Sequence, residues 1–191
     1  MTQLPNWFAK DGQLNFYNQL SEYADRPIRA LQIGAYTGDA SVWMYYNILK
    51  HPDSILIDVD TWSGSDEPAH HEMNWQSVET IYDAKTSQGR LDKKIVKFKG
   101  TSDWFFKNNV EMYDFIYVDG DHTAPSVIKD AVNSFDCLNP GGIIAFDDYQ
   151  WTAGLGVSKE PKAAIDAFYT IYIDRIEVLV NGYQFWVRKT V

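Results

Sequence analysis

Three absences narrow what this chain of 191 residues can be. No apolar run approaches the roughly 18 residues that span a bilayer, and the N-terminus lacks the basic flank and apolar stretch of a signal peptide. A single cysteine, Cys137, excludes an internal disulfide. Lys and Arg number 17 against 26 Asp and Glu, so no basic surface for a phosphate backbone is expected. We therefore predict a cytoplasmic protein with neither a membrane nor a nucleic-acid partner.

The chain also lacks G-x-G-x-x-G, the glycine motif of dinucleotide-binding folds, which argues against a nicotinamide cofactor. Its 45% hydrophobic content suits one compact domain. Apolar strand-like runs alternate with segments of helical period, the pattern of an α/β fold. The expected parallel strands are 28–36, 54–60, 94–100, 113–120 and 141–148, and one helix is expected over 77–89, between the second and third strands. The pair Asn181-Gly182 between two final β-rich runs predicts a tight antiparallel hairpin.

Residues just after each expected strand form a candidate site, because ligands of open parallel sheets collect beyond the carboxyl ends of the strands. In "GAYTG", Gly34 and Gly38 bracket a turn that brings backbone N–H groups to a ligand at the start of a helix. Asp60, at the next strand end, is placed to accept the hydroxyls of a ribose. Thr101 and Ser102 follow the third strand, where either hydroxyl caps the next helix or Ser102 meets an adenine edge.

Acids follow the fourth and fifth expected strands, in "VDGDH" and "GGIIAFDD". Asp119, Asp147 and Asp148 would repel one another without a cation, and oxygen ligands suit Mg²⁺, Mn²⁺ or Ca²⁺. The 28 positions from Asp119 to Asp147 hold one crossover helix, so the two strand ends can be adjacent. In the alternative interpretation, Asp148 only caps a loop and Asp121 caps the next helix.

The order of "LQIGAYTG", "LIDVDTWSG", "GTSDW", "FIYVDGDH" and "NPGGIIAFDDY" resembles that of class I S-adenosylmethionine-dependent methyltransferases. Within that superfamily, it looks most like the small metal-dependent O-methyltransferases of the catechol type, the macrolide sugar type and the D-G-D-H group. The likeness covers residues 28–190. It implies one Rossmann-like domain, 1–191, with a seven-stranded, mostly parallel sheet of order 3-2-1-4-5-7-6, helices on both faces, a C-terminal antiparallel hairpin, and a helical segment in 1–27 packed outside the sheet.

The resemblance also implies roles for single residues. The cofactor-binding residues it implies are Gly34, Ala35, Tyr36, Thr37, Gly38, Asp60, Thr101, Ser102 and Asp119. The metal ligands it implies are Asp119, Asp147 and Asp148. The catalytic residues it implies are His122, where the relatives carry a general base, and Asp119. Two positions depart from the pattern: Gln32 stands where an acidic residue is usual, and Ala40 stands where a serine is usual, with Ser41 one place later.

Methyl transfer from a sulfonium is an in-line displacement, so the enzyme must align acceptor oxygen, methyl and sulfur and make the oxygen nucleophilic. A divalent cation lowers the pKa of a bound hydroxyl, and His122 can remove its proton. We therefore predict Mg²⁺-assisted O-methylation of a small hydroxylated molecule or sugar. The alternatives are a methyltransferase without metal, an inactive cofactor-binding module, which Gln32 and Ala40 favour, and, last, a metal-dependent hydrolase. The loops 61–75 and 149–161 carry no motif that names the acceptor, and the sequence leaves homo-oligomerisation open.

Overall fold

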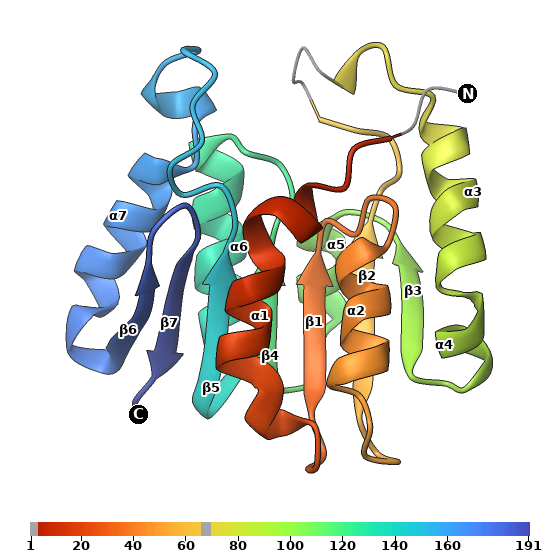
Figure 1. The fold of residues 1–191 in the computed structure, drawn as a ribbon. Coiled ribbons are helices and arrows are strands. Elements are labelled where there is room, and N and C mark those ends of the chain that lie inside the picture. The colour runs from red at the N-terminus through yellow and green to blue at the C-terminus, as the bar shows by residue number, and fades with distance from the viewer. Residues whose placement is uncertain (1–3, 66–69) are drawn as a thin grey trace.

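Seven strands make one sheet of order β3-β2-β1-β4-β5-β7-β6 in the computed structural model, which describes residues 4–65 and 70–191 (Figure 1). The strands are β1 (Arg29–Ile33), β2 (Ile55–Asp60), β3 (Ile95–Lys99), β4 (Tyr113–Val118), β5 (Leu138–Phe146), β6 (Ile176–Asn181) and β7 (Phe185–Lys189). Strands β1 to β5 are parallel, whereas β7 is antiparallel to both β5 and β6. The predicted fold class, strand order and terminal hairpin are confirmed.

Helices connect the strands and cover both faces of the sheet (Figure 1). The helical segments are η1 (Phe8–Gly12), α1 (Gln13–Leu20), η2 (Ser21–Tyr23), α2 (Asp39–Asn47), α3 (Trp75–Lys85), α4 (Ser87–Leu91), α5 (Ser102–Asn108), α6 (Ala124–Asp136), η4 (Val157–Lys159), α7 (Lys162–Tyr172) and η5 (Ile173–Arg175). Helices α3 and α4 replace the one helix expected over 77–89, and the break falls at Thr86, whose hydroxyl donates to the Tyr82 carbonyl. Within the described residues, no helix is both long and apolar enough to cross a membrane.

Successive side chains along each strand point to opposite faces of the sheet, and this divides the core into two layers, one on each face. In β4, Phe115 and Tyr117 point to the layer that α1 and α2 cover, and Ile116 and Val118 point to the layer beneath α6 and α7. Phe16 of α1 is fully buried and packs edge-on against Phe115 and Tyr117, with ring centroids 5.4 and 4.9 Å away. This contact attaches the N-terminal helix to the middle of the sheet.

The final hairpin differs from the expected one by the position of its turn. Asn181 pairs with Phe185, so Asn181 ends β6 and the turn consists of the three residues 182–184. Gly182 closes the turn by donating its N–H to the Gln184 carbonyl, 3.0 Å away. Tyr183 and Gln184, which the pattern assigns to the last strand, therefore lie in the turn.

Asp58 is an acid that is fully buried within β2. Its Oδ2 accepts a 2.7 Å hydrogen bond from the hydroxyl of Tyr82, which holds α3 against the sheet. Burial raises the pKa of Asp58 to about 7, although the hydrogen bonds from Tyr82 and Ser41 partly oppose that shift.

We expect the raised pKa of Asp58 to appear in the pH dependence of stability. Between about pH 4 and 7 the folded state keeps a proton on Asp58 that the unfolded state releases, so the free energy of unfolding falls as pH rises. The loss is at most about 1.4 kcal/mol per pH unit. Asp58→Asn keeps an acceptor for Tyr82 and removes the titration. Urea denaturation across this range should show a flatter profile for the variant, and parallel profiles would contradict the assignment.

Candidate functional site

A cavity of about 670 Å³ opens where the carboxyl ends of β1 to β5 meet. Among the residues predicted to bind a cofactor, those that line it are Gly34, Ala35, Tyr36, Asp60, Thr101, Ser102 and Asp119. Thr37 and Gly38 support the same loop from behind. Thr37 is buried and donates its hydroxyl to Asp39, and Gly38 is the residue before α2, with a left-handed φ of 80°. The structure thus collects predicted cofactor-binding residues from the ends of four strands, β1 to β4, around one cavity.

Gly34 brings the ends of β1 and β4 into direct contact. A Cβ atom at this position would lie 1.8 Å from the backbone oxygen of Asp119, and the φ of Gly34 is +83°. Only glycine combines that conformation with so close an approach. The loop after β1 and the acid after β4 are therefore neighbours in the cavity wall.

Asp60 organises the loop between β1 and α2. Its Oδ2 accepts the backbone N–H groups of Ala35 and Tyr36 at 2.8 and 2.9 Å, and its Oδ1 accepts that of Trp62 at 2.7 Å. Tyr36 adopts a positive φ of 47°, and its carbonyl accepts the indole N–H of Trp62. Because Asp60 also lines the cavity, its predicted contact with a ribose would add to this structural role and stays a prediction.

Thr101 and Ser102 begin α5, as one of the two sequence interpretations has it. The Thr101 hydroxyl accepts the N–H of Trp104, which makes Thr101 the N-cap, and it lines the cavity as well. Ser102 forms a side-chain hydrogen bond with Asp130 of α6. Asp130 is buried at the cavity wall, and burial raises the pKa of its carboxyl to about 7.

The two departures from the family pattern lie behind the same loop. Gln32 is buried, and its Nε2 donates to the carbonyl of Gly34 at 2.8 Å, so an amide supports the turn where an acid is usual. Its Oε1 accepts the hydroxyl of Ser41 at 3.4 Å. Gln32 and Ala40 both line the cavity. Gln32 therefore stabilises the loop between β1 and α2.

The adjacent acids Asp147 and Asp148 face different partners. Asp147 Oδ1 accepts the side-chain amide of Gln184 at 2.6 Å. Asp148 Oδ1 accepts the hydroxyl of Tyr183 at 2.6 Å, and its Oδ2 lies 2.9 Å from Nε2 of His122. Asp148 has a left-handed φ of 55°, which Asp tolerates better than most residues. Each member of the pair thus has its own set of hydrogen-bond partners.

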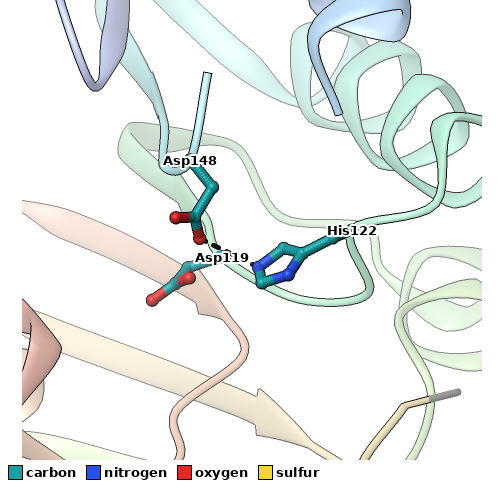
Figure 2. Close-up of side chains that lie close together, drawn as sticks. All are labelled: Asp119, His122 and Asp148. Atoms are coloured by element: carbon teal, nitrogen blue, oxygen red, sulfur yellow. Dashed lines mark ion pairs between the residues drawn. The ribbon is translucent and has the colours of Figure 1, made fainter. Parts of the chain in front are cut away.

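The side chains of Asp119, His122 and Asp148 lie close together, as Figure 2 shows. Each offers a ligand atom, and these atoms all lie within 4.8 Å of one another, in a search of the described residues. Asp147, the third predicted ligand, lines the same cavity but lies outside that group. The side chains of His122 and Asp148 are 17% and 13% exposed, so the group is shielded yet open to the cavity.

Crowding and burial of the acids at this site disfavour their charged forms and raise the pKa values of two of them, Asp119 and Asp147. Burial, and then the charges of Asp147 and Asp148, hold the pKa of Asp119 well above its ordinary value. Burial, and then the charge of Asp148, raise the pKa of Asp147 to about 6. The hydroxyl of Tyr117 is within hydrogen-bonding reach of Asp119 and Asp147, and its single hydrogen lowers the pKa of the carboxyl that accepts it. The carboxylates are therefore stabilised only in part by the protein itself.

Aromatic side chains surround the acids and the loop. Trp151 packs against the ring of His122, with centroids 4.9 Å apart, and Trp7 packs against Tyr36 at 4.8 Å. His70 lines the cavity and contacts Trp75. Part of the motif-free loop 61–75 falls outside the described residues, namely 66–69. The N-terminal segment that carries Trp7 therefore forms part of the cavity wall.

Residues 31–149 match the sequence profile of a family described as a methyltransferase domain. The chain belongs to the methyltransferase domain family. The matched segment runs from β1 to the residue after Asp148 and includes every residue that the sequence assigned to the site. A sequence comparison with curated proteins gave no match.

Solved structures of methyltransferases share the fold of this methyltransferase domain at low sequence identity. The O-methyltransferase TomG from Streptomyces achromogenes, in complex with SAM, is 12% identical, with a TM-score of 0.66 over 93% of this chain and 78% of that one. The O-methyltransferase from Bacillus cereus, in complex with SAH, is 13% identical, with a TM-score of 0.62 over 100% and 93%. The O-methyltransferase NovP is 16% identical, with a TM-score of 0.67 over 94% and 80%.

Three polar residues that contact the site escaped the sequence analysis. Asp130 had a signal, because it shares the buried face of α6 with Val127 and Ala131, where a polar residue needs a partner. Tyr183 and Gln184 had none, because their contacts depend on the turn of the final hairpin lying beside the end of β5.

Gly34→Ala should damage this site more than the same change at a glycine that has open space around its Cα atom. The new Cβ both clashes with the Asp119 carbonyl and disfavours the left-handed φ, so we expect a loss of about 3 kcal/mol or more in unfolding free energy. Binding of S-adenosylhomocysteine, measured by calorimetry, should be lost. Gly141→Ala is the matched control, because Gly141 has a φ of +80° and a Cβ added there would meet no atom within 4 Å. Equal destabilisation by both changes would contradict the steric argument.

Proposed function

We propose that this methyltransferase domain transfers the methyl group of S-adenosylmethionine to a hydroxyl oxygen of a small molecule, with a divalent cation, Mg²⁺ as first choice, and His122 as general base. The observation that carries the proposal is the convergence of Asp119, His122 and Asp148 at the cavity wall, beside the loop that begins at Gly34. The proposed cofactor-binding loop, which begins at Gly34, and the proposed proton acceptor, His122, thus line the same cavity.

The geometry around His122 suits proton removal. Its Nε2 lies 2.9 Å from Asp148 Oδ2, and a carboxylate in that position orients an imidazole and stabilises the proton it gains. Tyr183 in turn holds Asp148 through the other oxygen. Bound S-adenosylmethionine would supply the methyl group and would depart as S-adenosylhomocysteine. His122 would take the proton that the acceptor hydroxyl loses as its oxygen bonds to the methyl carbon.

The residues at the strand ends fit a divalent cation. Asp119 and Asp147 have raised pKa values because they are buried beside other carboxylates, and a cation would relieve that repulsion. We propose Asp119, Asp147 and Asp148 as its ligands. When bound, the cation would lower the pKa of the acceptor hydroxyl and orient it. Asp147 would bind through its other oxygen, because Oδ1 already accepts from Gln184.

For the cofactor we propose contacts along the wall from the Gly34 loop to α5. Backbone groups of 34–36 would face the methionine part, Asp60 the ribose and Ser102 the adenine, with Asp119 near the sulfonium. Two O-methyltransferases of the same fold, TomG bound to SAM and the Bacillus cereus enzyme bound to SAH, support S-adenosylmethionine as the cofactor. The aromatic side chains of Trp7 and Trp151 offer faces against which a ring or sugar acceptor could stack.

Removal of metal is expected to abolish transfer. Protein dialysed against EDTA should transfer no labelled methyl group to a panel of hydroxylated acceptors, and added Mg²⁺ should restore transfer. The affinity of the metal-free protein for S-adenosylhomocysteine should change little, because the proposed cation binds the acceptor and not the cofactor. Activity that EDTA leaves unchanged would favour the second candidate, a metal-independent methyltransferase that relies on the His122–Asp148 pair alone.

His122→Gln should reduce kcat by roughly 10² to 10⁴, the usual contribution of a general base. The binding of S-adenosylhomocysteine should stay close to wild type, and the loss of kcat should shrink as pH rises, because more acceptor is ionised without help. If the wild-type protein binds the cofactor but turns over no acceptor on a broad panel, and His122→Gln changes nothing, the chain is an inactive cofactor-binding module.

A further inference from the structure

Gln184 lies in the turn of the final hairpin, yet its side chain is fully buried and hydrogen-bonded at both ends. Its Oε1 accepts the indole N–H of Trp186 at 3.0 Å and the amide of Asn15 at 2.9 Å. Its Nε2 donates to Asp147 Oδ1 at 2.6 Å and lies 3.5 Å from the hydroxyl oxygen of Tyr117. One side chain thus links helix α1, the hairpin and an acid of the site.

The orientation of this amide is dictated by chemistry. The indole nitrogen of Trp186 can only donate a hydrogen bond, so the group it faces must be the oxygen of Gln184. The NH₂ group must then face Asp147, and the two carboxylate oxygens of Asp147 can only accept while it is ionised. A flipped amide would place two acceptors against each other and two donors against each other. Gln184 therefore presents a donor to Asp147 in the only arrangement that satisfies all these groups.

Packing prevents the amide from moving away. A Cβ atom on Gly12, the last residue of η1, would lie 2.9 Å from Nε2 of Gln184, so the N-terminal segment closes tightly over the amide. Below it, Tyr117 is fully buried and bonds Asp147 from the sheet. Asp147 is thus held by two side chains, that of Gln184 from the hairpin turn and that of Tyr117 from β4.

We infer that Gln184 is a positioning residue for the cation site: it holds Oδ1 of Asp147 so that the other carboxylate oxygen is offered to a divalent cation. The inference rests on the proposed function, in which Asp147 is a ligand. Hydrogen bonds to a ligating carboxylate fix its direction, and their removal typically weakens metal binding by about 10- to 100-fold. The N-terminal helix and the C-terminal hairpin then contribute to metal affinity without touching the metal.

The test is the affinity of the full chain for Mn²⁺, measured by calorimetry with S-adenosylhomocysteine at saturation. Gln184→Met keeps the length of the side chain and removes the donor, and we expect Mn²⁺ to bind about 10-fold more weakly or worse. The affinity for S-adenosylhomocysteine should stay at the wild-type value, because Gln184 does not line the cavity. Val187→Ala is the matched control: it removes buried packing from β7, and Val187 is not among the partners of Asp147. This control should bind Mn²⁺ like wild type.

Gly12→Ala is a second variant, which keeps every atom of Gln184 and crowds its amide. We expect a smaller loss of Mn²⁺ affinity, and this variant decides the matter if Gln184→Met does not fold. Wild-type Mn²⁺ affinity in both variants would overturn the role of Gln184 and leave the proposed function standing. No Mn²⁺ binding by the wild-type chain would overturn the cation itself, and the role of Gln184 with it. Equal losses in Val187→Ala and Gln184→Met would show that hairpin stability, and not the hydrogen bond, governs affinity.

Discussion

The contact between the ends of β1 and β4 is the constraint on which the rest of the site depends. At Gly34 the backbone approaches the Asp119 carbonyl so closely that a Cβ would lie 1.8 Å from it. The loop after β1 must therefore turn immediately, and Asp60 holds that turn by accepting the N–H groups of Ala35 and Tyr36. The course of the loop after β1 and the position of Asp119 in the cavity wall thus follow from one place where the chain has no room for a side chain.

Two adjacent aspartates at the end of a buried strand pose a problem of repulsion that the structure solves in part. Asp147 turns to Gln184, and Asp148, in a left-handed conformation, turns to Tyr183 and His122. Different donors stabilise each charge, yet burial still raises the pKa of Asp147 to about 6. The remaining unfavourable energy is the physical reason for which we propose a cation at this edge of the sheet.

Most of the fold could be predicted, because it depends on patterns that are local in the sequence. The alternation of strands and helices, the acids after β4 and β5 and the final hairpin are all visible in runs of a few residues. The predictions that were wrong concern the ends of elements, which are displaced by a few residues where a single contact sets the boundary. Helix α3 ends where Thr86 bonds back to Tyr82, and the hairpin turn is 182–184 because Asn181 pairs with Phe185. Neither contact leaves a trace in hydrophobic period.

The sequence by itself determined the class of fold, the succession of strands along the chain and the types of side chain at their ends, because these depend on periodicity and on short motifs. The order of the strands within the sheet was implied only by the resemblance to a known family. Only the tertiary structure decided which donor meets which acid. Asn15 and Gln184 are 169 positions apart, and Gln184 and Asp147 are 37 apart. Such pairs form only when helix α1, the hairpin and β5 pack together, so their partners are set by packing and not by spacing along the chain.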